Sequence, residues 1–539
     1  MEKLKLFVAC LFTLSFGIAQ EVEVVRIPME DGVILFADLY KANQPEGPVI
    51  LIRTPYQKEG MEIIAKHFSS KGYYVIVQDV RGKYASEGTF VPFLREKSDG
   101  ESTLKWIENQ PWSDGNVGLW GSSYLGYSAL SLSASANPVL KSIFHLSGWL
   151  DGTQVNTPGG AFHQSLIIPW LVFEGQKTRV NISKMDMYEL LEYVPTEEII
   201  PSMYFRLEDG DSIHMSQVSV SNNEFPFEQS KVSIFHLTGW YDFVLQGVID
   251  VHQRFKRFNS GPQFLKIGPW FHNQAYGGAS NTGELELSES GLINIEELMT
   301  LSLKWFDHTL KGQESTKLLP VEYFVLFENV WKTADEWPPK LSSDESLYLS
   351  LSRIEHSISK NGKSEFIYDP NQPVPTWGGA NFHFFMDEMG MREQTKIESR
   401  EDVICFTSSV FTQPKRFVGP VSVDLYFKTD AIGTDFTAKL TVVDSLGNSH
   451  NVSDGIVRLQ PNQTKGIQKT SIHLNDIAFL VKKGEQIRLQ ISSSNFPKFN
   501  RNPNTGVHPL EAKEFKISKQ TIYYGKEHPS KINLRVLEE

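Results

Sequence analysis

The sequence predicts an α/β fold built on a parallel sheet, followed by a separate all-β region. Short apolar runs rich in β-branched residues alternate with helical stretches from Val22 to about Leu150, as in strands covered by helices on both faces. After Gln313 the pattern becomes an alternation of apolar and polar residues, which is typical of sheets with one buried face. The length of 539 residues also exceeds what one hydrophobic core organises, so several folding units are expected.

The predicted elements of the parallel sheet follow one another along the chain. The runs Pro48–Ile52 and Tyr73–Val77 are predicted strands, and residues 60–70 between them have a helical pattern. A further strand over Val117–Trp120 leads into a helix rich in Ser, Ala and Leu. The Asn137-Pro138 pair ends this helix, because the residue before a proline disfavours helical backbone angles.

Two octapeptides in the sequence are almost identical. Ser142-Ile-Phe-His-Leu-Ser-Gly-Trp149 and Ser233-Ile-Phe-His-Leu-Thr-Gly-Trp240 differ at one position, and each is followed one residue later by an acid, Asp151 and Asp242 respectively. Because their flanking sequences differ, we interpret them as two strands of one sheet and not as a domain duplication. The segment between them, about 151–230, is rich in Met, Glu and Leu with helical spacing and predicts a cap over the strand ends.

The C-terminal part is predicted to be a β-sandwich of roughly 200 residues. Val421–Phe427, Ala438–Val442 and Ile487–Ile491 alternate with period two, and turns such as Asp444–Asn448 separate them. The predicted division is therefore a core, a cap and a sandwich, which occupy residues 21–150 with 231–313, residues 151–230, and residues 314–539 respectively.

The first 20 residues have the pattern of a secretory signal peptide. Lys3 and Lys5 form a positive start, Leu6–Ile18 is apolar, and Gly17-Ile18-Ala19 is a small-x-small cleavage site. The sequence therefore predicts an exported protein, periplasmic or extracellular. Cys405 is the one cysteine that remains after cleavage, so the mature chain forms no internal disulfide and depends on core burial.

Composition narrows the class of partner. The formal net charge is −12 and no run is rich in Lys or Arg, which disfavours nucleic acid and anionic membrane surfaces. No apolar run after the signal peptide approaches the length of a membrane span. Metal-binding and nucleotide-binding motifs are absent from the sequence, so no cofactor is expected. The sequence leaves the oligomeric state open.

The segment Gly121-Ser-Ser-Tyr-Leu-Gly126 carries the predicted nucleophile. It lies between a predicted strand and a predicted helix, where α/β-hydrolases place a serine on a sharp turn. Ser123 occupies the turn position, and Ser122 is one residue short of it. The usual pattern is G-x-S-x-G, whereas here Leu125 takes the second small position and the glycine follows one residue later.

A serine hydroxyl needs a base oriented by a buried acid, and α/β-hydrolases supply them in the order Ser, Asp or Glu, His. His272 follows the predicted strand Phe264–Ile267 and a Gly-Pro-Trp turn, so it lies at a strand exit. His145 and His236 lie inside strands and are interpreted as core residues. Asp242, 30 positions before His272, is the preferred acid, and Asp151 is the alternative from the first octapeptide.

The negative oxygen that forms during acyl transfer needs hydrogen-bond donors. The backbone N–H of Tyr124, directly after the predicted nucleophile, is one candidate. Arg53-Thr-Pro-Tyr56 ends an early predicted strand, where the second donor of α/β-hydrolases normally lies. The phenol of Tyr56 is therefore a second candidate, with a structural aromatic residue as the alternative interpretation.

With these residues in place, the chain resembles the cocaine esterase, α-amino acid ester hydrolase and X-Pro dipeptidyl-peptidase group, also called CocE/NonD hydrolases. The matching stretches span nearly the whole predicted mature chain: Arg53–Tyr56, Gln78–Gly82, Ser86–Gly88, Pro111–Gly126, Gly239–Asp242, Gly268–His272, Trp305–Gly312 and Phe496–Gly506. The resemblance implies an α/β-hydrolase core with a helical cap insertion and a C-terminal all-β jelly-roll sandwich.

The same resemblance implies roles for individual residues. It places the nucleophile on Ser123, the acid on Asp242 and the base on His272. The implied oxyanion hole combines the Tyr56 hydroxyl with the Tyr124 backbone N–H.

The expected function is a serine hydrolase that cleaves carboxylic ester or amide bonds of small molecules through an acyl-enzyme. An X-Pro dipeptidyl-peptidase or an α-amino acid ester hydrolase is the alternative enzyme, and an inert binding protein that uses the sandwich is the alternative outside catalysis. In the amino-ester branch, adjacent acids precede a Gly-Ala-Phe segment, but here Gln154 and Val155 precede Gly160–Phe162. Neutral acyl groups are therefore expected, with Trp149, Phe162, Trp170 and Phe173 available for apolar contacts.

Overall fold

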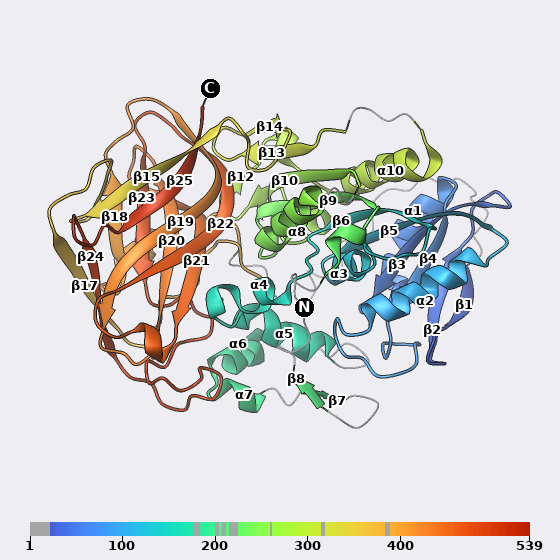
Figure 1. Ribbon diagram of the computed structural model, residues 1–539, viewed down its shortest axis with the longest axis horizontal. Helices are drawn as coiled ribbons and strands as arrows, with labels where there is room; N and C mark the ends of the chain where they lie inside the picture. Colours follow the sequence, from blue (N-terminus) through green and yellow to red (C-terminus); the bar gives the residue numbers. More distant parts are fainter. Residues whose placement is uncertain are drawn as a thin grey trace.

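A computed structural model describes residues 22–175, 184–199, 204–206, 212–214, 225–258, 261–313, 318–382 and 389–538. The predicted signal peptide lies outside these residues. The molecule has an α/β half and an all-β half, with a group of helices between them (Figure 1). No helix in the described ranges is long and apolar enough to span a membrane.

The α/β half is built on one mixed sheet. From one edge to the other, its strands are β1 (Val22–Pro28), β2 (Ile34–Tyr40), β4 (Tyr74–Asp79), β3 (Gly47–Thr54), β5 (Ser113–Ser122), β6 (Leu140–Leu146), β9 (Ser233–Tyr241), β10 (Gln263–Phe271), β13 (Val321–Val325) and β14 (Val330–Ala334). The strands from β4 to β13 run parallel, and β1, β2 and β14 pair antiparallel. The sheet therefore continues through β13 and β14, beyond the residue 313 at which the sequence pattern changes.

Helices cover both faces of this sheet (Figure 1). They are α1 (Glu62–Ser70), α2 (Glu96–Glu108), α3 (Tyr124–Ser131), α8 (Leu245–Arg257), α9 (Gln274–Gly277) and α10 (Ile295–Lys311). α2 and α8 bury Leu104 and Val251 in one hydrophobic cluster, and α1 and α10 bury Phe68 and Trp305 in the cluster of the other face. Because both faces are covered, β3 and β4 are buried along their whole lengths, as their unbroken apolar pattern predicts.

The first octapeptide supplies Ser142–Leu146 of β6, and the second forms all of β9 except its last residue. These strands are parallel neighbours in register, with Ser142 opposite Ser233 and Leu146 opposite Leu237. The prediction that they belong to one sheet is confirmed. The chain between them forms α4 (Gly152–Asn156), α5 (Gln164–Glu174), α6 (Lys184–Glu192) and α7 (Thr196–Ile199), and a short antiparallel pair, β7 (Tyr204–Arg206) and β8 (Ser212–His214).

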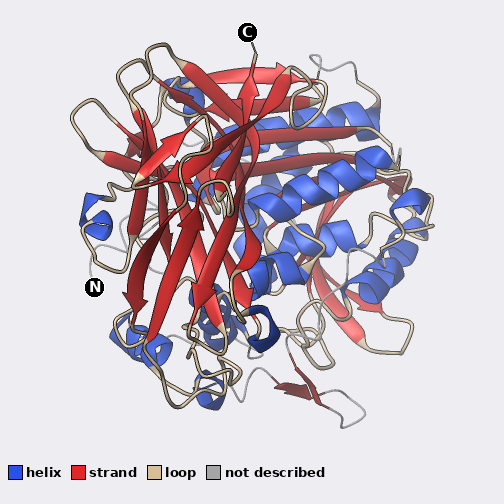
Figure 2. Ribbon diagram, turned by 60° about the vertical axis from the view of Figure 1, so that its left-hand side comes forward, coloured by secondary structure: helices blue, strands red, loops and turns tan. Residues whose placement is uncertain are grey.

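The C-terminal half consists of long, mostly antiparallel strands (Figure 2). They are β15 (Ser342–Ser350), β16 (Arg353–Glu355), β17 (Gly362–Tyr368), β18 (Ile404–Ser408), β19 (Lys415–Thr429), β20 (Thr434–Val443), β21 (Ser449–Leu459), β22 (Gln468–Val481), β23 (Gln486–Ser492), β24 (Ser518–Tyr524) and β25 (Lys531–Leu537), with α11 (Thr395–Glu398) between β17 and β18. Along β19, Val421, Val423, Leu425 and Phe427 are buried while residues between them are partly exposed, as period-two alternation predicts.

The two halves share a hydrophobic core. Leu326, just after β13, exchanges backbone hydrogen bonds with Ala478 and Leu480 of β22. The Trp337 indole N–H donates to the buried Asp476 carboxylate at 2.7 Å, and one cluster of buried side chains extends from α5 and α8 into the C-terminal strands. This shared core fixes the C-terminal half against the ends of β9 and β10, where the predicted acid Asp242 and the predicted base His272 lie, respectively.

Candidate active site

Ser123 lies on a sharp turn between β5 and α3. Its backbone angles, φ 57° and ψ −121°, fall in a region that residues with a side chain rarely adopt. The Ser123 N–H donates to Leu146 O of the neighbouring strand at 2.9 Å, which holds the strained turn in place. The serine is thus at the N-terminus of a helix, where unpaired N–H groups favour negative charge.

Two glycines allow this turn, and they explain the unusual spacing of the motif. A Cβ on Gly121 would lie 2.2 Å from the Leu125 carbonyl oxygen, and a Cβ on Gly126 would lie 3.0 Å from the Cα of Gly148. The second glycine is therefore needed one position after Leu125, where α3 lies against Gly148 in the chain that follows β6.

His272 connects Ser123 to Asp242. His272 Nε2 lies 2.9 Å from Ser123 Oγ, and His272 Nδ1 lies 2.8 Å from Asp242 Oδ1. Because a carboxylate only accepts, Nδ1 carries the proton and Nε2 is left as the acceptor for the serine hydroxyl. The side chains of His272 and Asp242 are 2% and 1% exposed, so solvent does not compete for the contact between them.

Three further groups bond to the Asp242 carboxylate. The Val244 N–H donates to Oδ1 at 3.1 Å, the Ser147 hydroxyl donates to Oδ2, and the Thr238 hydroxyl lies 3.4 Å from Oδ2. Asp151, the alternative acid, instead caps α4 and accepts from the Thr153 backbone N–H and hydroxyl. The structure therefore brings Asp242 to His272 and places Asp151 at a helix terminus.

Ser122, the alternative nucleophile, has a different partner. Its hydroxyl donates to Asn273 Oδ1 at 2.7 Å. Ser123 is thus the serine of the pair whose hydroxyl contacts His272. His145 and His236 lie in the strands below the site and bond to one another at 2.6 Å, in agreement with their interpretation as core residues.

Tyr56 faces the site with its side chain, whereas Tyr124 lies beside the nucleophile with its backbone. The Tyr56 ring lines the same cavity as Ser123, and its hydroxyl oxygen accepts a 3.0 Å hydrogen bond from the Trp170 indole N–H. The Tyr124 phenol points into the core, where it donates to Glu96 Oε1 and accepts from the Phe93 N–H, both at 2.9 Å. Tyr124 therefore has its backbone N–H, in the first turn of α3, next to the nucleophile.

A cavity of about 300 Å³ opens above Ser123 and His272. Its remaining wall is mainly apolar and aromatic, formed by Tyr56, Met61, Ser122, Leu125, Leu166, Trp170, Glu174, Phe243, Asn273, Tyr276 and Phe382. Phe243 packs against His272 with ring centroids 4.4 Å apart. Of the aromatic residues that the sequence suggested for this site, Trp170 lines the cavity, whereas Trp149, Phe162 and Phe173 pack in the core.

Glu174 is the one acidic residue among the described residues that line this cavity. The buried Lys83 donates to the Glu174 backbone carbonyl at 2.9 Å and places Nζ 3.8 Å from the carboxylate. Burial lowers the pKa of Lys83 to about 8, so it remains mostly cationic at neutral pH. Gln154 and Val155, which the sequence drew attention to, do not line this cavity.

Sequence reasoning missed Glu174, Phe243, Phe382 and Lys83. Phe243 directly follows Asp242 and Lys83 directly follows the Gln78–Gly82 stretch, so adjacency to motif residues was an available signal for these two. For metals, no cluster of three or more His, Cys, Asp or Glu side chains suited to an ion occurs in the part of the chain that the structure describes.

Comparison with known proteins identifies the family. Residues 31–274 match the X-Pro dipeptidyl-peptidase (S15) family, and residues 314–533 match the C-terminal non-catalytic domain of X-Pro dipeptidyl-peptidases. The chain is 30% identical to the cocaine esterase of Rhodococcus sp. (strain MB1 Bresler), over 95% of this chain and 98% of that protein. The chain belongs to the S15 family.

Solved structures show the same fold over the whole S15 chain. An aminopeptidase from a marine sediment Thaumarchaeota archaeon superposes with a TM-score of 0.83 at 22% identity, and an α-amino acid ester hydrolase with 0.82 at 22%; each alignment covers 99% of both chains. The match to the cocaine esterase and the two family matches make the protein an enzyme, a serine hydrolase with a C-terminal all-β domain. They do not favour the alternative of an inert binding protein.

Proposed function

We propose that this S15 protein cleaves carboxylic esters through an acyl-enzyme formed on Ser123. The observation that carries the proposal is the chain of hydrogen bonds from Ser123 Oγ through His272 to Asp242, with lengths of 2.9 and 2.8 Å. Such a chain activates an otherwise weak nucleophile, because the base accepts the serine proton while the buried acid stabilises the resulting imidazolium.

The residues act in two half-reactions. Ser123 Oγ attacks the ester carbonyl carbon, and its proton passes to His272 Nε2. The C–O bond to the alcohol then breaks, and His272 returns the proton to the departing oxygen. A water molecule attacks the acyl-enzyme in the same way and releases the acid. In both tetrahedral intermediates, the Tyr56 hydroxyl and the Tyr124 backbone N–H stabilise the negative oxygen.

The test is kcat on a chromogenic acyl ester for two adjacent serine variants. Ser123→Ala is expected to lower kcat by roughly 10⁴- to 10⁶-fold without unfolding. Ser122→Ala is the matched control and keeps most of the activity, because Ser122 bonds to Asn273 and not to His272. Equal losses in both variants would contradict the assignment of the nucleophile.

The proposed acyl group is neutral and apolar or aromatic. Trp170, Phe243 and Phe382 line the cavity, and the carboxylate of Glu174 faces the cationic Lys83 at 3.8 Å, so little net charge remains for a substrate ammonium. We expect a higher kcat/KM for a phenylacetyl ester than for the phenylglycyl ester with the same leaving group. A tenfold preference for the phenylglycyl ester would contradict this proposal.

Cleavage of X-Pro dipeptides from peptides is the second candidate, favoured by the family match over residues 31–274. It requires recognition of a peptide amino terminus, for which Glu174 is the carboxylate in the cavity wall. Activity on X-Pro anilides above that on matched neutral esters would favour the peptidase, and inactivity on these amides would favour the esterase.

Three finer features belong to the same proposal. We place a helical cap over residues 151–230, with α5 supplying Trp170 to the cavity, and a jelly roll over the strands from β15 to β25, because β13 and β14 belong to the first sheet. We also propose export to the periplasm or the cell exterior, with removal of residues 1–20. Cell fractionation and the N-terminal sequence of the purified mature protein test the export; a retained Met1 in the cytoplasm would contradict it.

A further inference from the structure

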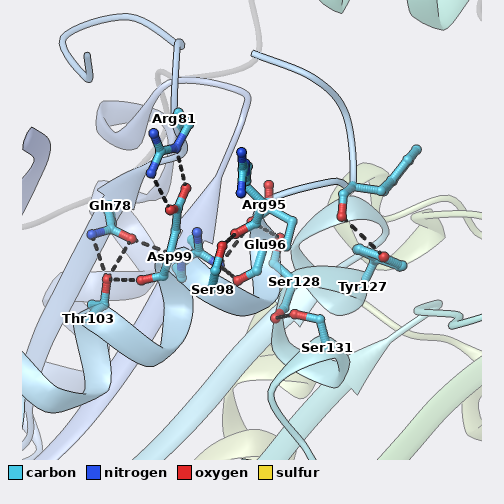
Figure 3. Close-up of polar contacts among 12 residues, drawn as sticks. Gln78, Arg81, Arg95, Glu96, Ser98, Asp99, Thr103, Tyr127, Ser128 and Ser131 are labelled. Carbon is cyan, nitrogen blue, oxygen red and sulfur yellow. Dashed lines mark hydrogen bonds and ion pairs between the residues drawn. The ribbon is translucent and has the colours of Figure 1, made fainter. Parts of the chain in front are cut away.

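Glu96, the first residue of α2, places a buried carboxylate against the helix that follows the nucleophile. Its side chain is 5% exposed. Oε1 accepts from the Tyr124 phenol at 2.9 Å, and Oε2 accepts from the Ser128 hydroxyl at 3.0 Å. Figure 3 shows Glu96 and Ser128 facing each other from α2 and α3. Both oxygens of the carboxylate are thus bonded to α3.

The same carboxylate also holds the end of β3. Arg53 Nη1 lies 2.9 Å from Glu96 Oε2 and donates to the Glu96 backbone carbonyl at 2.6 Å. Arg53 is 3% exposed, and its Nε donates to Gln78 Oε1 at 2.9 Å. Tyr56 follows Arg53 by three residues, so the ion pair fixes the strand end from which Tyr56 enters the cavity.

Tyr124 is clamped at its phenol oxygen. That oxygen donates to Glu96 and accepts from the Phe93 N–H, and the ring is 1% exposed. Because Tyr124 is the first residue of α3, a fixed phenol also fixes the backbone N–H next to Ser123.

We infer that Glu96 is a positioning residue that sets the separation of the two oxyanion donors, the Tyr56 hydroxyl and the Tyr124 N–H. This inference rests on the proposed function of those donors. One carboxylate contacts Tyr124 directly and holds the strand end before Tyr56 through Arg53. Oxyanion donors act only when they are aimed at the place where charge develops, and misplacement by about 1 Å can cost on the order of 100-fold in rate.

The main variant is Glu96→Gln, which keeps the size of the side chain and removes the charge that pairs with Arg53. Asp99→Asn is the matched control. Asp99 lies one turn further along α2 and forms an equally buried ion pair with Arg81 at 2.7 Å, visible in Figure 3, but it bonds to neither α3 nor β3. Both variants are expected to lower the Tm, since each takes a buried carboxylate away from its cation; Arg81 keeps a second ion pair, with Asp31 at 2.8 Å.

The two variants are expected to differ in kinetics on a chromogenic acyl ester. Glu96→Gln lowers kcat by about 10- to 100-fold with KM little changed, whereas Asp99→Asn leaves kcat near that of the unmodified enzyme. Tyr124→Phe, which removes the phenol bond to Glu96 and retains the backbone N–H, gives a smaller loss of kcat. This second variant keeps the test decisive if Glu96→Gln does not fold.

A double-mutant cycle with Tyr56→Phe separates positioning from general destabilisation. If Glu96 acts through the oxyanion donors, Glu96→Gln (or Tyr124→Phe) costs less when the Tyr56 hydroxyl is already absent. The same fold-loss with and without that hydroxyl, or equal kcat losses for Glu96→Gln and Asp99→Asn, would overturn the inference. In either case a Ser123→Ala variant that remains inactive would leave the proposed function intact.

Discussion

The two octapeptides have nearly the same sequence and form neighbouring strands of one sheet, but the acids that follow them make different contacts. They are parallel neighbours, paired in register from Ser142 with Ser233 to Leu146 with Leu237. The acid after the second copy, Asp242, contacts His272 at 2.8 Å. The acid after the first copy, Asp151, caps α4. A nearly identical strand sequence therefore does not determine the position of the acid that follows the strand.

The chain leaves the two strands differently. β6 ends at Leu146, and Ser147 then adopts a φ of 57° with its N–H bonded to Leu237 O. β9 continues to Tyr241, so Asp242 follows directly at the strand exit. The direction in which the backbone leaves the sheet thus separates a candidate triad acid from a helix cap.

The two octapeptides differ at one position, and the side chains at that position contact the same carboxylate. Ser147 in the first copy and Thr238 in the second both direct their hydroxyls to Oδ2 of Asp242. The first strand therefore supports the carboxylate that follows the second strand.

Exchanging each acid for its amide tests the contrast most strongly. Asp242→Asn is expected to lower kcat by on the order of 10⁴-fold, because an amide favours the wrong tautomer of His272. Asp151→Asn is expected to change kcat little, since Asn also caps helices. The measurement is kcat/KM on an acyl ester for both variants, and the reverse ranking would assign the acid to the first copy.

Removing each hydroxyl gives a smaller effect. Ser147→Ala removes a buried donor to the Asp242 carboxylate, and such hydrogen bonds contribute about 1.5–3 kcal/mol; we expect kcat to fall roughly 10-fold. Thr238→Val is expected to cost less, because that hydroxyl lies 3.4 Å from the carboxylate. A larger loss for Thr238→Val than for Ser147→Ala would show that the first copy does not support Asp242.

The paired histidines predict a dependence of stability on pH. Burial lowers the pKa of His236 to about 4 and that of its partner His145 well below the usual value. Between about pH 6.5 and 4 the unfolded chain binds protons that the folded chain does not, so stability falls as the pH is lowered through this window.

Replacing His236 with Gln is expected to reduce this dependence. The measurement is the Tm at pH 7, 5.5 and 4.5, with His356→Gln as the control, because the His356 side chain is 76% exposed. An unchanged slope of Tm with pH in His236→Gln would contradict a neutral buried pair.

Local sequence carried much of the fold and of the candidate site. Ser123, Asp242 and His272 each follow a strand directly, so the strand pattern indicated their place at the carboxyl ends of a parallel sheet. It left Asp151 open as the alternative acid, and the family resemblance favoured Asp242. Gly121 and Gly126 were informative for a steric reason, because a Cβ at either would meet neighbouring backbone.

Contacts between segments far apart in the chain could not be predicted from the sequence pattern. Lys83 meets Glu174 across 91 positions, and Phe382 enters the cavity from the C-terminal half. β13 and β14 extend the first sheet although they follow the change of pattern at Gln313. In each case the partner is chosen by tertiary packing, which short-range periodicity does not encode.

The most direct measurement for the central claim is the site of covalent labelling by a fluorophosphonate, which mimics the tetrahedral intermediate and forms a stable bond to an activated serine. The labelled protein is digested and the modified peptide is sequenced by mass spectrometry. We predict a single adduct on Ser123 that is lost in His272→Ala, since the imidazole accepts the serine proton at 2.9 Å. An adduct on Ser122, or undiminished labelling of Ser123 without His272, would contradict the account.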